Sequence, residues 1–557
     1  MQALSSSTRA HNISLMGSEQ FDVLVIGGGV TGAGVALDAA ARGYKVALVE
    51  KIDFASGTSS KSTKLVHGGI RYLPNFDFAL VREALVERGL LLKNAPFLVH
   101  PVGFVLPIYK GDRHPVGLPF TTPWGIGLGV ILDIGLWLYD GLAGRHNVKR
   151  HRRLSRKEVM RLAPALVTEN LKEGFIYYDG QTNDARLTLA ILRTAVQYGA
   201  TVANYAEVTS FVTENGKVRG AHVRDNLGEQ QFVVRARHIV NATGVFAEEV
   251  EALTEAGSLV QVEPSKGVHL VFSREDVQIG DDAIVLPETD DKRILFLVPW
   301  QSRAVFGTTD TGSGDLDHPT ATKDDIDYLL HHLNRYLSVN LTGDDIISVY
   351  AGYRPLLRAR SAEHSTAKLS RTHAVLQNSS GLVTIVGGKL TTYRRMAQDT
   401  VDVLSRRDGS TSMSHPTSNL PLSGSAGWPA AKRDLEAKGT ALGLSPQTIA
   451  HLGESYGSHA NALLSMIESD ASLGRHLIED LPYLRAEVIY ACRHEMAMTL
   501  DDMLARRTSI ILEDRDRGSG IVDEVAALMA QELDWSPEQQ KAMIDAYRTA
   551  LQQQIPV

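Results

Sequence analysis

A glycine-rich turn between an apolar strand and a helix of small residues constrains the fold more than any other feature of this chain. The segment FDVLVIGGGV is typical of a buried strand ending in a tight turn, TGAGVALDAAARGY of a helix, and KVALVE of a second strand. A strand, a crossover helix and a second strand of this length form a βαβ unit, whose two strands are parallel. The sequence therefore predicts an α/β protein built on a parallel sheet.

Gly27, Gly29 and Gly32 give this turn the spacing GxGxxG. The first glycine permits the tight turn, the second lets the backbone approach a pyrophosphate, and the third lets the helix pack closely on the sheet. Glu50 ends the second strand, 18 residues after Gly32, where a carboxylate accepts hydrogen bonds from ribose hydroxyls. Together these residues predict a dinucleotide site, with free N–H groups of the helix facing the phosphates.

Two further glycine turns indicate which dinucleotide is bound. ARHIVNATG places Gly244 after another strand, and GLVTIVGGKLTTYRRM places Gly387 and Gly388 between a strand and a helix. A turn so far downstream can close over the other end of a cofactor that is longer than a nicotinamide requires. We therefore expect FAD, bound by a nucleotide domain that is discontinuous in sequence.

The remaining segments predict a second sheet and a helical region. VRGAHVRD, QQFVVRAR, GVHLVFS, RILFLVPW and RAVFGTTD alternate or run apolar at strand length, which favours a mixed or antiparallel sheet. Ser, Gly, Pro and Thr dominate residues 408–428, and helical periodicity dominates beyond them. The predicted organisation is a flexible tail (1–20), discontinuous FAD-binding and substrate domains (21–407, the FAD part mainly 21–75, 180–250 and 375–407), a linker (408–428) and a helical domain (429–557).

Composition narrows the functional classes. A formal net charge of −7 argues against a nucleic-acid partner, because such domains carry a basic excess on one face. Cys492 is the single cysteine, so the sequence excludes an intrachain disulfide and a multi-cysteine metal cluster, and we expect no metal. Cys492 itself is expected to be a small buried apolar side chain.

Residues 123–143, PWGIGLGVILDIGLWLYDGLA, form a long apolar stretch that Asp133 and Asp140 interrupt. Charges at bilayer depth are costly, which disfavours a transmembrane helix. We expect a helix buried against protein, with contact to a membrane surface as the alternative.

Longer motifs carry a resemblance to a known family. TSSKSTKLVHGGIRYL (58–73), FGTTD (306–310), GYRPL (352–356) and GGKLTTYR (387–394) closely resemble the FAD-dependent glycerol-3-phosphate dehydrogenases. AEVIYACRHEMAMTLDDMLARRT is similar to the helical cap domain of that family. The resemblance implies a D-amino-acid-oxidase-like fold, with a Rossmann-type FAD-binding domain, an interleaved mixed-sheet substrate domain and a C-terminal all-helical cap.

The resemblance also implies a reaction, the oxidation of sn-glycerol 3-phosphate to dihydroxyacetone phosphate with noncovalent FAD. In this family the electrons usually pass to a membrane quinone, and in its oxidase branch they pass to oxygen and give hydrogen peroxide. A cytoplasmic protein with peripheral membrane contact and a homodimer are the corresponding expectations. Two alternatives are an amine or amino-acid oxidase of the same fold, which would bind a carboxylate with fewer cationic groups, and a flavin-retaining protein that works by binding partners.

A phosphorylated substrate requires several fixed donors, and the planar fork of arginine binds two phosphate oxygens at once. By similarity the substrate cluster is Arg71, Arg354, Arg371 and Lys389, with Tyr72 lining the pocket. Thr372 stands where relatives commonly carry an acidic residue, which weakens the assignment around Arg371. The expected FAD-binding residues are Gly27, Gly29, Gly32, Glu50, Thr58, Ser59, Ser60, Gly244, Asp310, Gly387, Gly388, Lys389, Leu390 and Thr391.

Oxidation of a secondary alcohol by hydride transfer also releases the hydroxyl proton, so a base within hydrogen-bond reach is expected. A neutral histidine suits this role at neutral pH. His67 is the expected base and His269 the second candidate, while Arg354 can polarise the hydroxyl. Arg506 and Arg507, which follow DDML, are expected on a solvated charged face with no chemical role.

Overall fold

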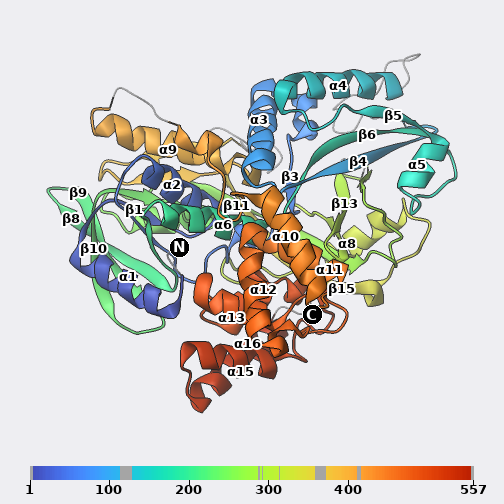
Figure 1. The fold of residues 1–557 in the computed structure, drawn as a ribbon. Helices are drawn as coiled ribbons and strands as arrows, with labels where there is room; N and C mark the ends of the chain where they lie inside the picture. Colours follow the sequence, from blue (N-terminus) through green and yellow to red (C-terminus); the bar gives the residue numbers. More distant parts are fainter. Residues whose placement is uncertain are drawn as a thin grey trace.

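The computed structural model describes residues 4–112, 128–286, 289–291, 293–312, 314–357, 372–410 and 415–553. Two β-sheets lie side by side, and helices cover their outer faces (Figure 1). The predicted fold class is confirmed, since one sheet is mainly parallel, the other is mixed, and the C-terminal region is helical. The domain boundaries stay a prediction.

The first sheet, called the nucleotide sheet below, contains the predicted βαβ unit. In spatial order its strands are β16 (Ala374–Gln377), β17 (Val383–Val386), β10 (Gln231–Asn241), β1 (Gln20–Ile26), β2 (Val46–Val49) and β7 (Thr201–Ala203), and β9 (Lys217–Asp225) and β8 (Ala206–Glu214) extend it from β10. The strands from β17 to β7 are parallel, as a crossover helix between β1 and β2 requires. Three pieces of chain far apart in sequence therefore end at the same edge.

The second sheet, called the substrate sheet below, is mixed. Its strands in spatial order are β15 (Ile346–Leu357), β11 (Val262–Ser273), β14 (Arg303–Gly307), β13 (Leu295–Trp300), β12 (Ala283–Leu286), β4 (His100–Tyr109), β6 (Leu171–Gln181) and β3 (Leu65–Val66), with β5 (Arg152–Ser155) beside β6. β12 and β4 pair parallel, and the other pairs are antiparallel. The expectation of a second, mixed sheet is confirmed for GVHLVFS, RILFLVPW and RAVFGTTD. It is wrong for VRGAHVRD and QQFVVRAR, because these segments form β9 and β10 and pair with the parallel strands of the nucleotide sheet.

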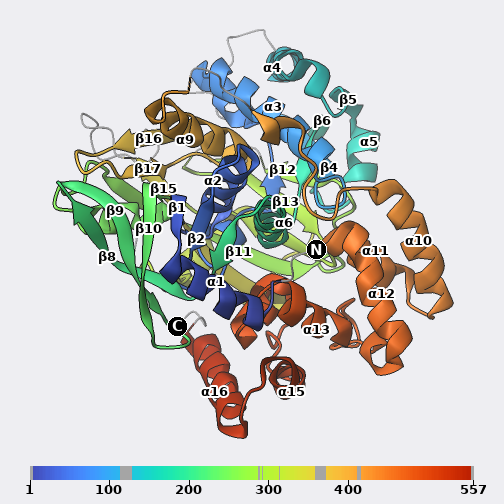
Figure 2. The ribbon, with the colours of Figure 1, turned by 60° about the vertical axis from the view of Figure 1, so that its left-hand side comes forward.

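Helices pack on both faces of the nucleotide sheet. α2 (Val30–Ala41) has small side chains and is almost wholly buried between α6 (Asp184–Gln197) and α9 (Tyr393–Arg407). The substrate sheet is flanked by α3 (Phe78–Asn94), α4 (Leu128–Ala143), α5 (Arg156–Leu162) and α8 (Lys323–Asn334), and α7 (Ala247–Ala252) follows β10. The C-terminal helices are α10 (Trp428–Ala441), α11 (Pro446–Tyr456), α12 (Ala460–Ser469), α13 (Arg485–His494), α14 (Ile510–Glu513), α15 (Val522–Leu533) and α16 (Pro537–Gln553), and they gather on one side of the molecule (Figure 2).

The predicted flexible tail over residues 1–20 is wrong, because α1 (Ser6–Ser18) is a helix packed on the nucleotide sheet. Ile13 and Met16 join the core on the face opposite α2. The Arg9 guanidinium lies 2.5 Å from the Asp225 carboxylate, and both side chains are buried. A helix with few apolar residues is held here because its polar side chains find buried partners.

Residues 408–428 have the predicted linker composition, but their described part is packed. The N–H of Leu422 donates to the carbonyl of Asn94 at 2.8 Å, and the N–H of Ser423 donates to Thr194 Oγ1 at 2.8 Å.

In the C-terminal helical region, the expectation that Arg506 and Arg507 are solvated is wrong, since their side chains are 5% and 1% exposed. The expected burial of Cys492 is confirmed, and burial raises the pKa of its thiol to about 12.

α4 covers the described part of the apolar stretch 123–143, and residues 123–127 lie outside the described residues. The expectation of a buried helix is wrong for one face, where Val130, Ile134, Trp137 and Leu138 are between 41% and 64% exposed. Asp140 faces inward and accepts a hydrogen bond from the N–H of His151 at 3.0 Å. Among the described residues, no helix combines the length and the apolarity that crossing a bilayer requires.

Candidate cofactor and substrate site

A cavity of about 960 Å³ lies between the two sheets. The nucleotide sheet contributes the turn after β1, the turn after β10 and the turn after β17, and the substrate sheet contributes side chains of β4, β6, β11 and β15. A cavity of this size suits a large elongated ligand, because drug-sized ligands already occupy several hundred Å³. The cavity thus joins the predicted nucleotide turns to the predicted substrate residues.

The turn after β1 has the geometry that its glycines predict. Gly27 has a φ of +108°, and a Cβ on Gly32 would lie 1.9 Å from the carbonyl oxygen of Gly27. α2 can therefore approach β1 only if residue 32 lacks a side chain. Ser59 Oγ accepts a hydrogen bond from the N–H of Val30 at 2.9 Å, so the loop after β2 closes over the first turn of α2.

Glu50 is held at the end of β2 by two backbone donors. Its Oε2 accepts from the N–H of Gly28 at 2.7 Å and its Oε1 from the N–H of Ile52 at 2.9 Å. Burial raises the pKa of this carboxyl group, and the two backbone hydrogen bonds oppose that shift. A glycine turn, a helix N-terminus and a fixed carboxylate are the set that the pyrophosphate and ribose of FAD require, so the residues present fit this cofactor.

The turn after β17 contacts the loop of residues 67–69, called the HGG loop below. Gly387 and Gly388 have φ values of +81° and +78°, and a Cβ on Gly388 would lie 2.4 Å from the sulfur of Met396. Thr391, in the short helix η7 (Leu390–Thr392), accepts a hydrogen bond from the N–H of His67 on its Oγ1 at 3.1 Å. Two motifs that are 324 residues apart therefore form one wall of the cavity.

Two cations lie against the ring of Tyr72. Arg71 donates from Nη2 to the Tyr72 hydroxyl at 2.9 Å, and Lys389 Nζ lies 4.1 Å from the centre of the ring. Like charges repel when they converge, so this arrangement favours an anion between them. This end of the cavity suits a phosphate group.

Arg354 enters the cavity from β15. Its Nη2 donates to Thr308 Oγ1 at 3.1 Å, and its guanidinium also donates to the carbonyl of Thr309 at 3.3 Å. A Cβ on Gly267 would lie 2.6 Å from the same Nη2, so β11 passes close beneath the guanidinium. Asp310 does not line the cavity, and its carboxylate lies 3.9 Å from Arg354 Nη1, where it orients the guanidinium.

Both candidate histidines line the cavity. The His269 ring stacks on Tyr350 with centroids 4.7 Å apart, and its Nε2 lies 2.9 Å from Thr63 Oγ1. Burial lowers the pKa of His269 well below its usual value, and Arg354 and Lys64 lower it further. His269 is therefore neutral and weakly basic at neutral pH.

Asp179 was missed by the sequence reasoning. Its buried carboxylate accepts from Arg88 Nη1 at 2.5 Å, from the Tyr139 hydroxyl at 2.8 Å and from the N–H of Gly68 at 3.1 Å. Asp179 thus fixes the HGG loop that carries His67. Asp179 lies on β6, whereas its partners lie on α3, on α4 and in the loop after β3, so no local spacing in the sequence could have indicated them.

Most of the remaining predicted residues line the cavity. Arg371 lies outside the described residues, and Gly32 supports the turn from behind the cavity wall. The cavity is lined by Gly27, Gly29, Glu50, Thr58, Ser59, Ser60, His67, Arg71, Tyr72, Gly244, Arg354, Gly387, Gly388, Lys389, Leu390 and Thr391. Phe104, Tyr177 and Phe296 add an aromatic wall that the sequence motifs did not indicate.

Known families and proteins match the sequence of this chain over most of its length. Residues 22–394 match the family described as FAD dependent oxidoreductase, and residues 415–540 match the C-terminal domain of alpha-glycerophosphate oxidase. The chain is 43% identical over 536 residues to glycerol-3-phosphate dehydrogenase 2 of Mycobacterium tuberculosis, covering 96% of this chain and 88% of that protein. It is 37% identical to the mitochondrial glycerol-3-phosphate dehydrogenase of Homo sapiens, covering 98% of this chain and 75% of that protein.

A solved structure supports the same relationship. The glycerol-3-phosphate dehydrogenase from Bacillus halodurans, solved in complex with FAD, superposes with a TM-score of 0.80 and 31% identity. The match covers 99% of this chain and 98% of that one. The predicted cofactor, FAD, is confirmed.

The Gly32→Ala substitution is expected to abolish FAD retention, because the new Cβ would lie 1.9 Å from the carbonyl oxygen of Gly27. The visible absorbance of flavin per protein chain measures this directly. Gly141→Ala is the matched control, since no atom lies within 4 Å of the added Cβ on α4. A Gly32→Ala protein that purifies with a full complement of FAD would contradict the close-packing argument.

Proposed function

The chain belongs to the FAD-dependent glycerol-3-phosphate dehydrogenases, and we propose that it oxidises sn-glycerol 3-phosphate to dihydroxyacetone phosphate and passes the electrons to a quinone. One observation carries the proposal for the substrate. Arg71, Lys389 and Arg354 enter the same cavity that the FAD-binding turns line, and His67 lies beside them. A phosphorylated alcohol supplies both the anion for the cations and the proton for the base.

In this proposal, the three cationic side chains of the cavity bind and orient the substrate. Arg71 and Lys389, both close to the ring of Tyr72, hold the phosphate, and Arg354 polarises the reacting hydroxyl from β15. Thr308 and the carbonyl of Thr309 fix the guanidinium of Arg354, so its direction is set before the substrate binds. An amino-acid substrate would need fewer cations, which disfavours the oxidase alternative within this fold.

The hydroxyl proton passes to His67 in this proposal. The alternative base, His269, has a depressed pKa because it is buried beside Arg354 and Lys64, and a weakly basic imidazole accepts a proton poorly. Asp179 holds the N–H of Gly68, so the loop that presents His67 is fixed from behind. FAD, when bound, supplies the hydride acceptor, and the protein supplies binding, orientation and charge.

The proposed reaction is tested by following flavin bleaching after glycerol 3-phosphate is added without oxygen. Rapid bleaching is expected, followed by fast reoxidation with a quinone analogue and slow reoxidation with oxygen. An absence of bleaching would refute the substrate, whereas fast formation of hydrogen peroxide would identify the oxygen-using alternative. The two halves of the experiment therefore separate the substrate from the acceptor.

His67→Gln is expected to slow anaerobic flavin reduction about 100-fold or more, the usual contribution of a positioned general base. His222→Gln is the control, since His222 is exposed on β9 and does not line the cavity. A larger loss in His269→Gln than in His67→Gln would assign the base to His269 instead.

The exposed face of α4 supports the proposed membrane contact. Val130, Ile134, Trp137 and Leu138 follow the spacing i, i+4, i+7 and i+8, so they lie on one side of the helix. An exposed apolar stripe of this kind suits the boundary between headgroups and acyl chains. A quinone is dissolved in that layer, so the contact would bring the enzyme to its acceptor.

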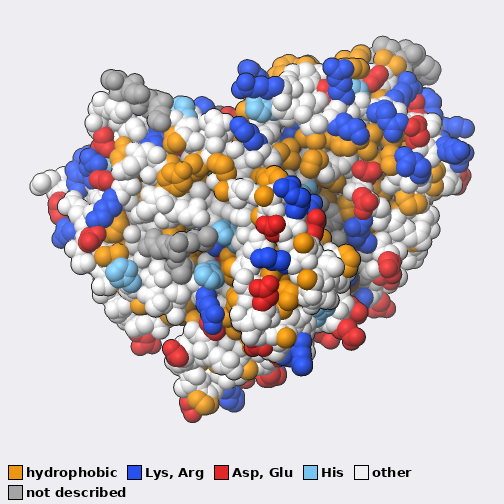
Figure 3. Space-filling view, in the orientation of Figure 1, with side chains coloured by type: hydrophobic (Ala, Val, Ile, Leu, Met, Phe, Trp, Pro, Cys, Tyr) orange, Lys and Arg blue, Asp and Glu red, His pale blue; other side chains and the backbone are white. Residues whose placement is uncertain are grey.

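A basic segment follows this face directly. Residues 145–161 contain eight Lys or Arg and one acidic residue, Glu158. Lys and Arg side chains gather at the upper right of Figure 3, over α4 and β5. Anionic lipids attract such segments by about 1 kcal/mol for each basic residue near the surface. We therefore propose peripheral association on the cytoplasmic face, and the homodimer stays a prediction.

Leu138→Glu is expected to weaken sedimentation with vesicles that contain anionic lipid, because it places a carboxylate on the apolar face of α4. Leu259→Glu is the matched control, since Leu259 is 47% exposed, against 41% for Leu138, but lies outside α4. Binding of the unchanged protein should also weaken with added salt. Equal vesicle binding by both variants would contradict the assignment of this surface.

A further inference from the structure

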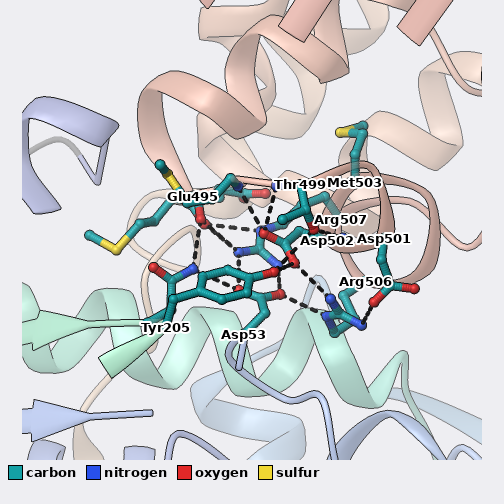
Figure 4. Close-up of polar contacts among 12 residues, drawn as sticks. Asp53, Tyr205, Glu495, Thr499, Asp501, Asp502, Met503, Arg506 and Arg507 are labelled. Carbon is teal, nitrogen blue, oxygen red and sulfur yellow. Dashed lines mark hydrogen bonds and ion pairs between the residues drawn. The ribbon is translucent and has the colours of Figure 1, made fainter. Parts of the chain in front are cut away.

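The C-terminal helical domain is joined to the nucleotide domain by buried charges around Asp53 (Figure 4). Asp53 is wholly buried in the loop after β2. Its Oδ2 accepts from Arg506 Nε at 2.7 Å and from Arg507 Nη1 at 2.6 Å, and its Oδ1 accepts from Arg507 Nη2 at 2.8 Å. One carboxylate of the nucleotide domain thus binds two guanidinium groups of the C-terminal domain.

A single turn of π-helix, η11 (Asp502–Arg507), presents both arginines to Asp53. The wider turn places successive side chains on one inward face, and such turns are frequent at functional sites. Arg506 also contacts Asp501 at 2.6 Å and Asp502 at 2.8 Å, while Arg507 donates to the carbonyl of Glu495 at 2.7 Å. The arginines are therefore held by their own domain before they meet Asp53.

Tyr205 connects the same cluster to the nucleotide sheet. Its hydroxyl donates to Asp502 Oδ1 at 2.6 Å, and its backbone N–H donates to the carbonyl of Ile52 at 2.6 Å. Asn204 Nδ2 donates both to Asp53 Oδ1 and to the carbonyl of Met496, each at 3.0 Å. The end of β7 thus touches the C-terminal domain and the Asp53 loop together.

The Asp53 loop is also part of the FAD-binding turn. Glu50, three residues earlier, accepts from the N–H of Gly28, and the N–H of Ala55 donates to the carbonyl of Gly28 at 3.1 Å. Phe54 packs so closely that a Cβ on Gly28 would lie 2.8 Å from its ring. Asp53 therefore lies between two residues that each hydrogen-bond to the same glycine of the turn.

Asp53 is ionised in this setting. Burial raises the pKa of its carboxyl group, but Arg507 and Arg506 outweigh burial and hold the pKa well below its usual range. A buried carboxylate that loses its cations leaves an uncompensated charge, which is strongly destabilising. Undocking of the C-terminal domain would remove both cations from Asp53 and is therefore expected to destabilise this conformation of the loop.

We propose that the C-terminal domain is a positioning element for FAD, in which Arg506 and Arg507 act through Asp53 on Glu50 and the Gly28 turn. Docking of the domain and binding of FAD are then thermodynamically coupled. Each event strengthens the other by the same factor, because a coupling free energy is reciprocal. The inference goes beyond the proposed reaction, since it concerns the cofactor and holds for any substrate.

The test compares Asp53→Asn with Glu487→Gln in the full-length protein. Glu487 is a matched buried carboxylate inside the C-terminal domain, where it accepts from Tyr456 at 2.8 Å and from His451 at 2.9 Å. FAD is removed, and its dissociation constant is measured by flavin fluorescence as it is added back. Asp53→Asn should raise this constant at least tenfold, and Glu487→Gln should leave it within about twofold.

Hydrogen exchange of the backbone amides of residues 495–508 gives the reciprocal measurement. In the unchanged protein and in Glu487→Gln, FAD should slow this exchange, and in Asp53→Asn it should not. If Asp53→Asn does not fold, Arg507→Lys takes its place, because lysine keeps the charge and loses the two-pronged contact. An unchanged FAD constant in the folded variant, or an equal rise in Glu487→Gln, would overturn the proposal.

Discussion

The parallel register of β1, β10 and β17 is the constraint on which the site depends. Ile26 pairs with Asn241, and Asn241 pairs with Thr384, so the three strands end at one edge. The carboxyl ends of parallel strands are where α/β proteins bind ligands, because the turns that follow all face the same crevice. The three glycine turns of the cavity follow these strands, and the hydrogen bond from the N–H of His67 to Thr391, after β17, fastens the HGG loop to the same edge.

Charged residues near that edge are of two kinds, buried carboxylates that fix loops and cations that line the cavity. Asp179, which lines the cavity, and Asp53 in the loop after β2 are buried carboxylates that fix loops, and the guanidinium groups of Arg88 and Arg507 offset their negative charge. At the proposed substrate end, Arg71 donates to the hydroxyl of Tyr72 and Arg354 to that of Thr308, and the Asp310 carboxylate lies 3.9 Å from Arg354. Two guanidinium groups and the ammonium group of Lys389 thus line the end of the cavity where the proposal places a phosphate dianion.

The sequence allowed the fold class and the cofactor to be predicted because both depend on local spacing. The GxGxxG turn, the strand before it and Glu50 lie within one βαβ unit, so their geometry follows from periodicity and glycine positions alone. Most of the residues assigned by resemblance line the cavity, although their roles stay predictions. Asp179 and Asp53 could not be found in this way, because Arg88 and Arg507 are 91 and 454 residues away from them.

The wrong expectations share one physical cause. Polarity predicted a free tail at residues 1–20 and solvated side chains at Arg506 and Arg507, yet Arg9, Arg506 and Arg507 are each buried against a distant partner. Hydropathy measures the free energy of transferring a side chain out of water. It takes no account of a partner that compensates a buried charge. α4 is the converse case, because its apolar face is exposed although periodicity predicts it to be covered. The membrane contact proposed for α4 would cover this face with an apolar phase from outside the chain.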